Sequence, residues 1–203
     1  MQEIRFHGRG GQGTVVASVI LAKAFFAVGY YVQSFPHFGV ERRGAPVEAY
    51  LRLDKKKILI RSSVYNPDAV IIQDCKLLEA ADVTRGLKPG GWILINSPVR
   101  PENLEPFNGY KLAQVDATGI AMDINLGTRT HPMVNTAMVG AFSGIMEILP
   151  LNAVTEVIQK EISAKPEQNV KAATLACETV TCFGMVDQVQ RRGRNRETGK
   201  RIK

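Results

Sequence analysis

Cysteine is scarce in this sequence, and its few positions form no pattern. Only Cys75, Cys177 and Cys182 occur among the 203 residues, and no two of them make a Cys-x-x-Cys pair. An odd number without framework spacing excludes the disulfide scaffold of a small secreted protein and indicates a reducing compartment. We therefore expect a cytoplasmic protein without an iron–sulfur cluster of its own, since such clusters need closely spaced cysteines.

Long apolar runs are also missing. No segment approaches the about 18 consecutive apolar residues that a membrane-spanning helix needs, so we expect no membrane partner. The first seven residues lack a basic stretch followed by an apolar core, and we expect no secretory signal. Hydrophobic residues still make up 45% of the chain, which is enough to bury the core of one domain.

Motifs for nucleotide hydrolysis and for metals are absent as well. No Gly-x-x-x-x-Gly-Lys-Ser/Thr phosphate loop occurs, which excludes the usual ATPase. The three histidines, His7, His37 and His131, are too scattered to predict a metal site. The sequence therefore predicts neither a catalytic residue nor a metal ligand in this chain.

Excess charge is confined to the C-terminal end. Residues 191–203 hold seven of the 26 basic residues and one of the 19 acidic residues, which leaves a net charge of +1 for residues 1–190. We expect 1–190 to be a single domain and 191–203 to be a disordered basic tail. A nucleic-acid-binding module is a hypothesis that we do not favour; it predicts salt-sensitive binding that disappears when the tail is removed.

Strand and helix patterns alternate along most of the chain. The predicted strands are 2–8, 30–34, 47–53, 57–61, 69–73, 92–96 and 110–115. The predicted helices are 14–28, 76–87, 133–149, 151–163 and 168–189, and 35–46 is predicted as a loop. This order indicates an α/β, Rossmann-like domain with a mostly parallel sheet, helices on both faces and a helical C-terminal third. Residues 54–56 predict an inserted antiparallel hairpin between 47–53 and 57–61.

A glycine-rich turn joins the first predicted strand to the first helix. It consists of Gly8, Arg9, Gly10, Gly11, Gln12 and Gly13, and it matches Gly-x-Gly-x-x-Gly. Glycines allow a tight turn and close approach of a ligand, and free N–H groups at a helix start attract anions. The same glycines can also serve only to pack the helix against the strand, and the two roles can coexist.

Dinucleotide binding is the first hypothesis for such a turn. A nicotinamide site usually needs Asp or Glu about 20 residues further on, at the end of the second strand, to hold the ribose. Here that strand ends in Val32-Gln33-Ser34, and Glu41 is the first acidic residue after the turn. A Rossmann-type NAD-dependent dehydrogenase therefore stays as the alternative interpretation.

The loop at 35–46 contains two adjacent arginines, Arg42 and Arg43. In an open parallel sheet the ends of the first two strands border one crevice, which would place these arginines beside the glycine turn. A guanidinium suits phosphate or carboxylate, so turn and arginines together are a candidate cradle for a polyanionic group. Alternatively, the arginines pair with Glu41 or with a partner protein.

Several motifs in this order are shared with a known family. They are His7–Gly13, Ser34-Phe35-Pro36, Phe38-Gly39, Glu41–Val47, Arg52, Arg61, Asn66–Val70, and Asn135 with Met138–Ala141. With them, residues 3 to about 185 resemble the gamma subunit of pyruvate and other 2-oxoacid:ferredoxin oxidoreductases. The basic tail lies outside the resemblance.

The resemblance implies a reaction and a set of partners. A 2-oxoacid, pyruvate by default, is oxidatively decarboxylated to an acyl-CoA while ferredoxin is reduced. Thiamine diphosphate, magnesium and iron–sulfur clusters would belong to alpha, beta and delta-type subunits or fused equivalents, with coenzyme A as co-substrate. This chain would bind no cofactor alone and would be structural.

For this chain the resemblance implies two sets of residues. The glycine turn (8–13) with Arg42 and Arg43 would help to hold coenzyme A. A loop surface formed by Phe35, Phe38, Gly44 and Pro46 would lie in a subunit interface, where aromatic residues and arginines are common.

Overall fold

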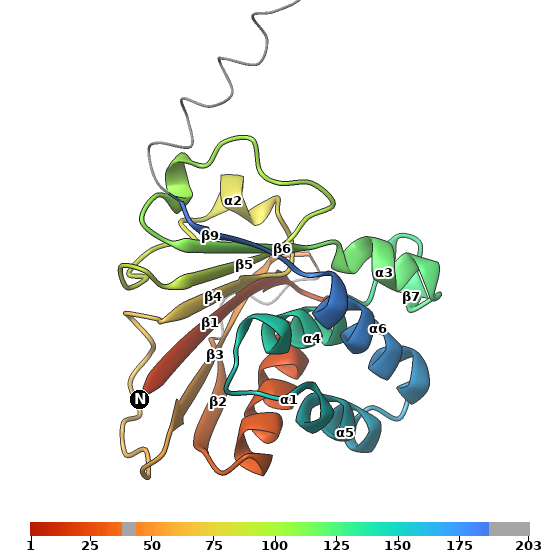
Figure 1. The fold of residues 1–203 in the computed structure, drawn as a ribbon, viewed down its shortest axis with the longest axis horizontal. Coiled ribbons are helices and arrows are strands. Elements are labelled where there is room, and N and C mark those ends of the chain that lie inside the picture. Colours follow the sequence, from red (N-terminus) through yellow and green to blue (C-terminus); the bar gives the residue numbers. More distant parts are fainter. Residues whose placement is uncertain (38–43, 187–203) are drawn as a thin grey trace, which may run out of the picture.

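A seven-stranded sheet is the centre of the fold in the computed structural model, which describes residues 1–37 and 44–186 (Figure 1). The strand order is β2-β3-β1-β4-β5-β6-β9. The bounds are β1 Gln2–Arg9, β2 Tyr31–His37, β3 Pro46–Asp54, β4 Ala69–Ile72, β5 Trp92–Asn96, β6 Lys111–Val115 and β9 Thr181–Met185. The pairs β1–β4, β4–β5 and β5–β6 are parallel, whereas β3 and β9 run antiparallel to their neighbours. The predicted mostly parallel α/β fold is confirmed.

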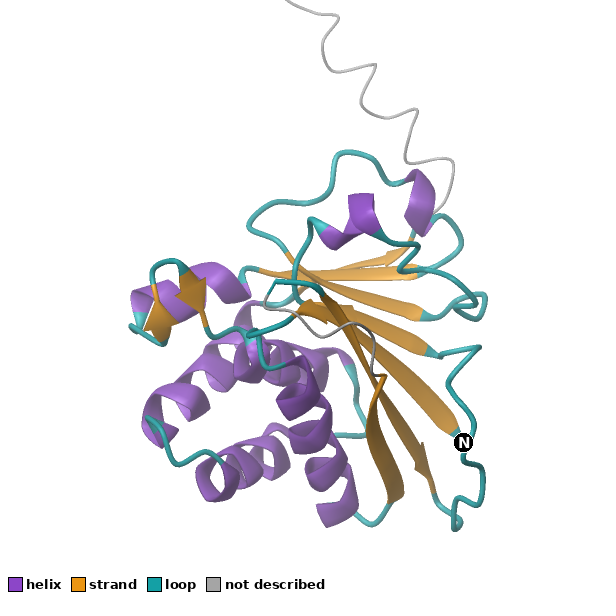
Figure 2. Ribbon diagram, turned by 180° about the vertical axis from the view of Figure 1, so that it is seen from behind, coloured by secondary structure: helices purple, strands orange, loops and turns teal. Residues whose placement is uncertain are grey.

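Helices lie on both faces of this sheet, but unequally (Figures 1 and 2). The helices are α1 Thr14–Ala27, α2 Leu77–Ala80, α3 Ala117–Asp123, α4 Asn135–Ile145, α5 Leu151–Glu161 and α6 Pro166–Thr179, with a 3-10 turn, η1, at Glu105–Phe107. One face packs against α1, α4, α5 and α6, and this is the larger core. The other face carries a smaller apolar cluster under α2 and η1, where β4, β5 and β6 are covered.

Residue pattern explains why the central strands form where they do. All of β4, Ala-Val-Ile-Ile, is buried, as expected of a parallel strand covered on both faces. β1 alternates instead: Ile4 and Phe6 face the larger core, and Arg5 and His7 point to the opposite face. A short hairpin of β7 Gly127–Thr128 and β8 His131–Pro132 projects beside α3 (Figure 2).

Glycine allows α4 and α6 to pack closely. A Cβ atom on Gly140 would collide with the backbone of Ala173 on α6. The two helices therefore touch through their backbones, and together with α5 they confirm the predicted helical C-terminal third. No helix within residues 1–37 and 44–186 is both long and apolar enough to cross a bilayer.

The predicted hairpin was placed wrongly. Residues 57–61 form no strand; β3 pairs instead with β1 on one side and β2 on the other. The pair of antiparallel strands that follow one another in the chain is therefore β2–β3. The predicted loop at 35–46 is wrong at both ends, because β2 extends to His37 and β3 begins at Pro46. Pairing between distant strands overrides the local turn signal of residues 54–56.

Three predicted helices were too long, and the one predicted at 133–149 spans only Asn135–Ile145. Of 76–87 only Leu77–Ala80 is an α-helix, and the following residues form turns whose carbonyls accept hydrogen bonds from Arg5. The helix predicted at 168–189 ends at Thr179 and is followed by β9. Cys182, expected on that helix, lies in β9, because strand pairing with β6 outweighs the helical pattern.

Candidate functional site

The glycine turn lies between the end of β1 and the start of α1. Gly11 (φ 97°) and Gly13 (φ 71°) both adopt left-handed conformations that favour glycine. Among the described residues, a Cβ atom on Gly11 would meet nothing within 4 Å, whereas one on Gly13 would lie 2.6 Å from Nδ2 of Asn135. Gly13 therefore serves packing, whereas Gly11 meets no side chain or backbone atom of the described residues.

Hydrogen bonds tie the turn together but leave part of it unused. The Arg9 amide donates to Oε1 of Gln12 (2.8 Å), and the Gln12 amide donates to the Arg9 carbonyl (3.0 Å). Among the residues that the structure describes, the amides of Gly11, Gly13 and Thr14 donate to no acceptor. Free amides at a helix start form an environment for an anion.

The segment after the undescribed residues 38–43 packs directly on this turn. The Gly10 amide donates to the Ala45 carbonyl (2.9 Å), and the Gly44 amide donates to the Gly10 carbonyl (3.2 Å). Pro46 is paired with Arg9 at the end of the β1–β3 ladder. Residues 44–46 thus lie against the glycine turn by way of β3, since β2 is not adjacent to β1. Arg42 and Arg43, which the sequence predicts beside the turn, lie outside the described residues.

A carboxylate sits on the other side of the turn. Asp74, just beyond β4, accepts from Nε of Arg9 at 2.7 Å and from Nε2 of Gln12 at 3.4 Å. An ion pair with Asp74 therefore holds the Arg9 guanidinium at the turn. An acidic residue directly after a buried strand was the sequence signal that could have placed Asp74 here.

The carboxyl ends of β1, β4 and β5 carry a buried polar cluster beneath the turn. Thr14 Oγ1 donates to Oε1 of Gln73 (2.8 Å), and Nδ2 of Asn96 donates to the Gln73 carbonyl (2.8 Å). A Cβ atom on Gly8 would collide with Thr14 and Gln73, so Gly8 is needed for packing. Nε2 of Gln73 is buried without a partner among the described residues.

The sheet face away from α1 holds a second polar cluster on β1 and β3. Nε of Arg5 donates to Nε2 of His7 (3.0 Å), and the Tyr50 hydroxyl donates to Oε2 of Glu48 (2.7 Å). Burial lowers the pKa of His7 from 6.5 to about 4, although Glu48 opposes the shift. Burial, followed by the hydrogen bond to Glu48, raises the pKa of Tyr50. The imidazole that accepts from Arg5 is therefore neutral near neutral pH, and the phenol that donates to Glu48 is protonated.

The predicted interface residues are only partly described. Phe35 lies half-buried on β2, with its ring 5.4 Å from that of Tyr50 and the guanidinium of Arg52 5.3 Å from its centroid. Phe38, Arg42 and Arg43 lie outside the described residues. Within the described ranges no three His, Cys, Asp or Glu side chains gather as a metal site.

The sequence matches a known protein family over most of its length. The family model of pyruvate ferredoxin/flavodoxin oxidoreductase matches residues 3–179. The chain belongs to this family. Its relative in Thermococcus kodakarensis, the pyruvate/ketoisovalerate oxidoreductases common subunit gamma, is 51% identical over 177 residues, covering 85% of this chain and 94% of the relative.

Solved structures of the family agree with the fold. The pyruvate oxidoreductase subunit PORC of Thermotoga maritima is 35% identical with a TM-score of 0.75, over 90% of this chain and 98% of that one. The 2-oxoglutarate:ferredoxin oxidoreductase of Magnetococcus marinus, solved with 2-oxoglutarate, coenzyme A and succinyl-CoA bound, is 20% identical with a TM-score of 0.70, over 92% of this chain and 32% of that one. The second likeness shows the fold alone. The resemblance to a gamma subunit drawn from the sequence is confirmed.

The position of β3 between β1 and β2 argues against the dinucleotide hypothesis. In a nicotinamide-binding sheet the strand after the first helix lies beside β1, so that an acid at its end reaches the ribose. Here β2 is at the sheet edge, with β3 between it and β1. An acid at the end of β2 would therefore lie one strand further from the turn than that site requires.

Proposed function

We propose that this chain is a non-catalytic gamma subunit that helps to hold coenzyme A in a cytoplasmic 2-oxoacid:ferredoxin oxidoreductase. The complex would decarboxylate a 2-oxoacid, pyruvate by default, pass the acyl group to coenzyme A and reduce ferredoxin. Its thiamine diphosphate, magnesium and iron–sulfur clusters would be held by alpha, beta and delta-type partners or fused equivalents. The described part of this chain contributes no cluster of metal ligands to that chemistry.

One observation carries the coenzyme A part of the proposal. Gly11 faces open space, and the amides of Gly11, Gly13 and Thr14 are unused among the described residues. A phosphate would accept from such amides and would gain from the positive end of the 14-residue helix α1. Arg9, held by Asp74, adds a guanidinium at the same turn.

A matched pair of variants in the assembled complex tests this proposal. Gly11→Val would fill the open side of the turn, and we expect the apparent KM for coenzyme A to rise by about tenfold or more, as losing one or two charge-assisted hydrogen bonds implies. Gly29→Val is the control, because Gly29 also has a positive φ (84°) and open space but lies at the opposite end of α1.

Assembly must be checked for both variants by their content of thiamine and iron. If Gly11→Val assembles and turns over with an unchanged KM for coenzyme A, the ligand role of the turn is wrong. The turn would then be an element of subunit contact only.

A further inference from the structure

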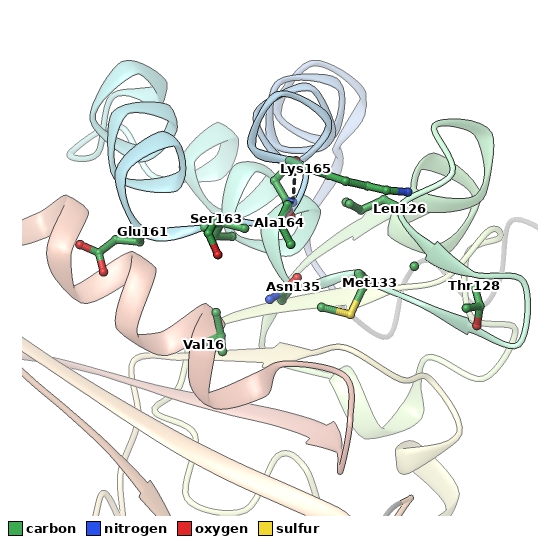
Figure 3. Close-up of a pocket in the computed structure, with 12 residues that line it drawn as sticks. Val16, Leu126, Thr128, Met133, Asn135, Glu161, Ser163, Ala164 and Lys165 are labelled. Atoms are coloured by element: carbon green, nitrogen blue, oxygen red, sulfur yellow. Dashed lines mark hydrogen bonds between the residues drawn. The ribbon is translucent and has the colours of Figure 1, made fainter.

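A cavity of about 560 Å³ opens on the helical side of the molecule (Figure 3). It lies between the starts of α1 and α4, the connection from α5 to α6, and the β7–β8 hairpin. Its apolar walls are formed by Val16, Leu126, Met133 and Ile162. This size and this lining, apolar with a few polar groups, are those of a small-molecule site.

One polar side chain in this cavity has no partner. Asn135, the first residue of α4, is only 2% exposed, and its Oδ1 atom is buried without a hydrogen bond among the described residues. Figure 3 shows the side chain between Val16 and Met133. Leaving a buried amide oxygen unpaired costs about 1–3 kcal/mol, so the group points to a ligand that supplies a donor.

The second asparagine of the cavity, Asn169, has hydrogen-bond partners for both atoms of its amide group. Nδ2 of Asn169 donates to the carbonyls of Ala164 and Lys165, both at 3.0 Å, and its Oδ1 accepts from Thr136. Asn169 therefore has a structural role, whereas the buried Oδ1 atom of Asn135 accepts no hydrogen bond within the described ranges.

The charged residues of the cavity are already engaged. Nζ of Lys165 donates to the Asn125 carbonyl (2.7 Å), and Glu161 forms an ion pair with Lys23. The positive ends of α1 and α4 disfavour a cationic ligand. The cavity therefore suits an apolar ligand that carries a neutral hydrogen-bond donor. An amide group fits best, because it can donate to Oδ1 of Asn135 and accept from Nδ2 of the same side chain.

We propose that this cavity binds the amide-bearing aliphatic arm of a small molecule, with Asn135 pairing to one of its amides. Pantetheine, the arm of coenzyme A, has this chemistry, and naming it rests on the proposed function. Asn135 also lies against Gly13. The cavity and the glycine turn therefore share the start of α1, so one ligand can place phosphates on the turn and its arm in the cavity.

The test uses the assembled complex, without 2-oxoacid, and two fragments as probes. Pantetheine has the arm without the nucleotide, and adenosine 3′,5′-bisphosphate has the nucleotide without the arm. Val16→Trp fills the mouth of the cavity, and its control is Val19→Trp, one turn further along α1 and outside the cavity lining. Both valines are exposed, at 46% and 36%.

We expect Val16→Trp to weaken pantetheine binding by tenfold or more and to leave adenosine 3′,5′-bisphosphate binding unchanged, while Val19→Trp changes neither. Gly11→Val should weaken adenosine 3′,5′-bisphosphate binding and leave pantetheine binding unchanged. If pantetheine does not bind, or binds equally to wild type and Val16→Trp, the cavity inference is wrong even when the turn binds the bisphosphate. If Gly11→Val leaves bisphosphate binding unchanged, the proposed function fails independently.

Asn135→Leu provides a second readout. Removing the unpaired amide should abolish most pantetheine binding and raise the melting temperature of the ligand-free complex, because a buried polar group without a partner is removed. A lower melting temperature, together with unchanged pantetheine binding, would assign Asn135 a packing role against Gly13 and would overturn the inference.

Discussion

Both faces of β1 and β3 are largely buried, but they differ in the chemistry of the side chains that they bury. Toward α1 the strands present Ile4, Phe6 and Leu51, which are part of the larger apolar core. On the opposite face they present Arg5 (2% exposed) and His7 beside Glu48 and Tyr50, which make hydrogen bonds with one another and with nearby carbonyls. Apolar packing depends little on pH, whereas the polar face depends on every partner and on its protonation.

The apolar face should show the largest effect of a single substitution. We expect Phe6→Ala to cost about 4 kcal/mol of unfolding free energy, through lost burial and the remaining cavity. Denaturant unfolding measures it, with Phe26→Ala as control, because Phe26 is 68% exposed on α1. Equal effects of the two variants would contradict the assignment of this face as the core.

Breaking the polar face should cost somewhat less. Arg5→Met retains much of the side-chain volume but removes the donor to His7 and to the carbonyls of Val83 and Arg85. Because these acceptors lose their donor, we expect the unfolding free energy to fall by about 3 kcal/mol in the same denaturant experiment. A neutral or stabilising effect would show that an apolar residue serves equally well here, as it does at some buried ion pairs.

Lowering the pH should destabilise the polar face but not the apolar face. The pKa of His7 is lowered in the folded state to about 4, so the unfolded chain binds more protons between pH 6.5 and 4. Stability should therefore fall as pH drops through this window, by roughly 2 kcal/mol on reaching pH 5. His7→Gln should remove most of this dependence in pH-resolved denaturant titrations, and an unchanged slope would assign it to other groups.

The smallest effect on the chain itself is expected at Phe35. Replacing this partly buried ring on the polar face by Ala should cost about 1–2 kcal/mol of unfolding free energy, less than at the fully buried Phe6, because less apolar area is lost. If the face docks on a partner subunit, Phe35→Ala should instead weaken assembly, measured by dilution of the complex. Phe26→Ala, on the other side of the sheet, is again the control, and equal assembly of the two would remove Phe35 from the interface.

Local patterns allowed much of the fold to be predicted. Local sequence patterns predicted three elements correctly: β4, β5 at Trp92–Asn96, and the helix after the glycine turn. Each strand is a short apolar run, and the helix has apolar residues at helical spacing. The glycine turn was also located from sequence. Its division into a packing glycine, Gly13, and an open one, Gly11, depends on Asn135 from α4 and could not be read from nearby residues.

Features that arise from contacts between distant residues were missed. β9 contains Gly184 at a positive φ and pairs with β6 across a bulge, and this pairing joins residues far apart in the sequence. Asp74 and Gln73 join the candidate site only because β4 lies beside β1. The cavity around Asn135 is assembled from four separate segments, and no spacing along the chain reveals it.

The position of β3 between β1 and β2 imposes an order on folding. Within the part of the chain that the structure describes, β2 pairs with β3 alone, and β1 pairs with β3 and β4. A nascent chain that has emerged only to residue 45 therefore holds two strands that cannot pair with each other in the native way. The first native ladder must wait for Pro46–Asp54, and β6 receives its outer neighbour only when Thr181–Met185 arrives. The sheet is thus completed late in synthesis, and until then its open edges are available for association with other chains.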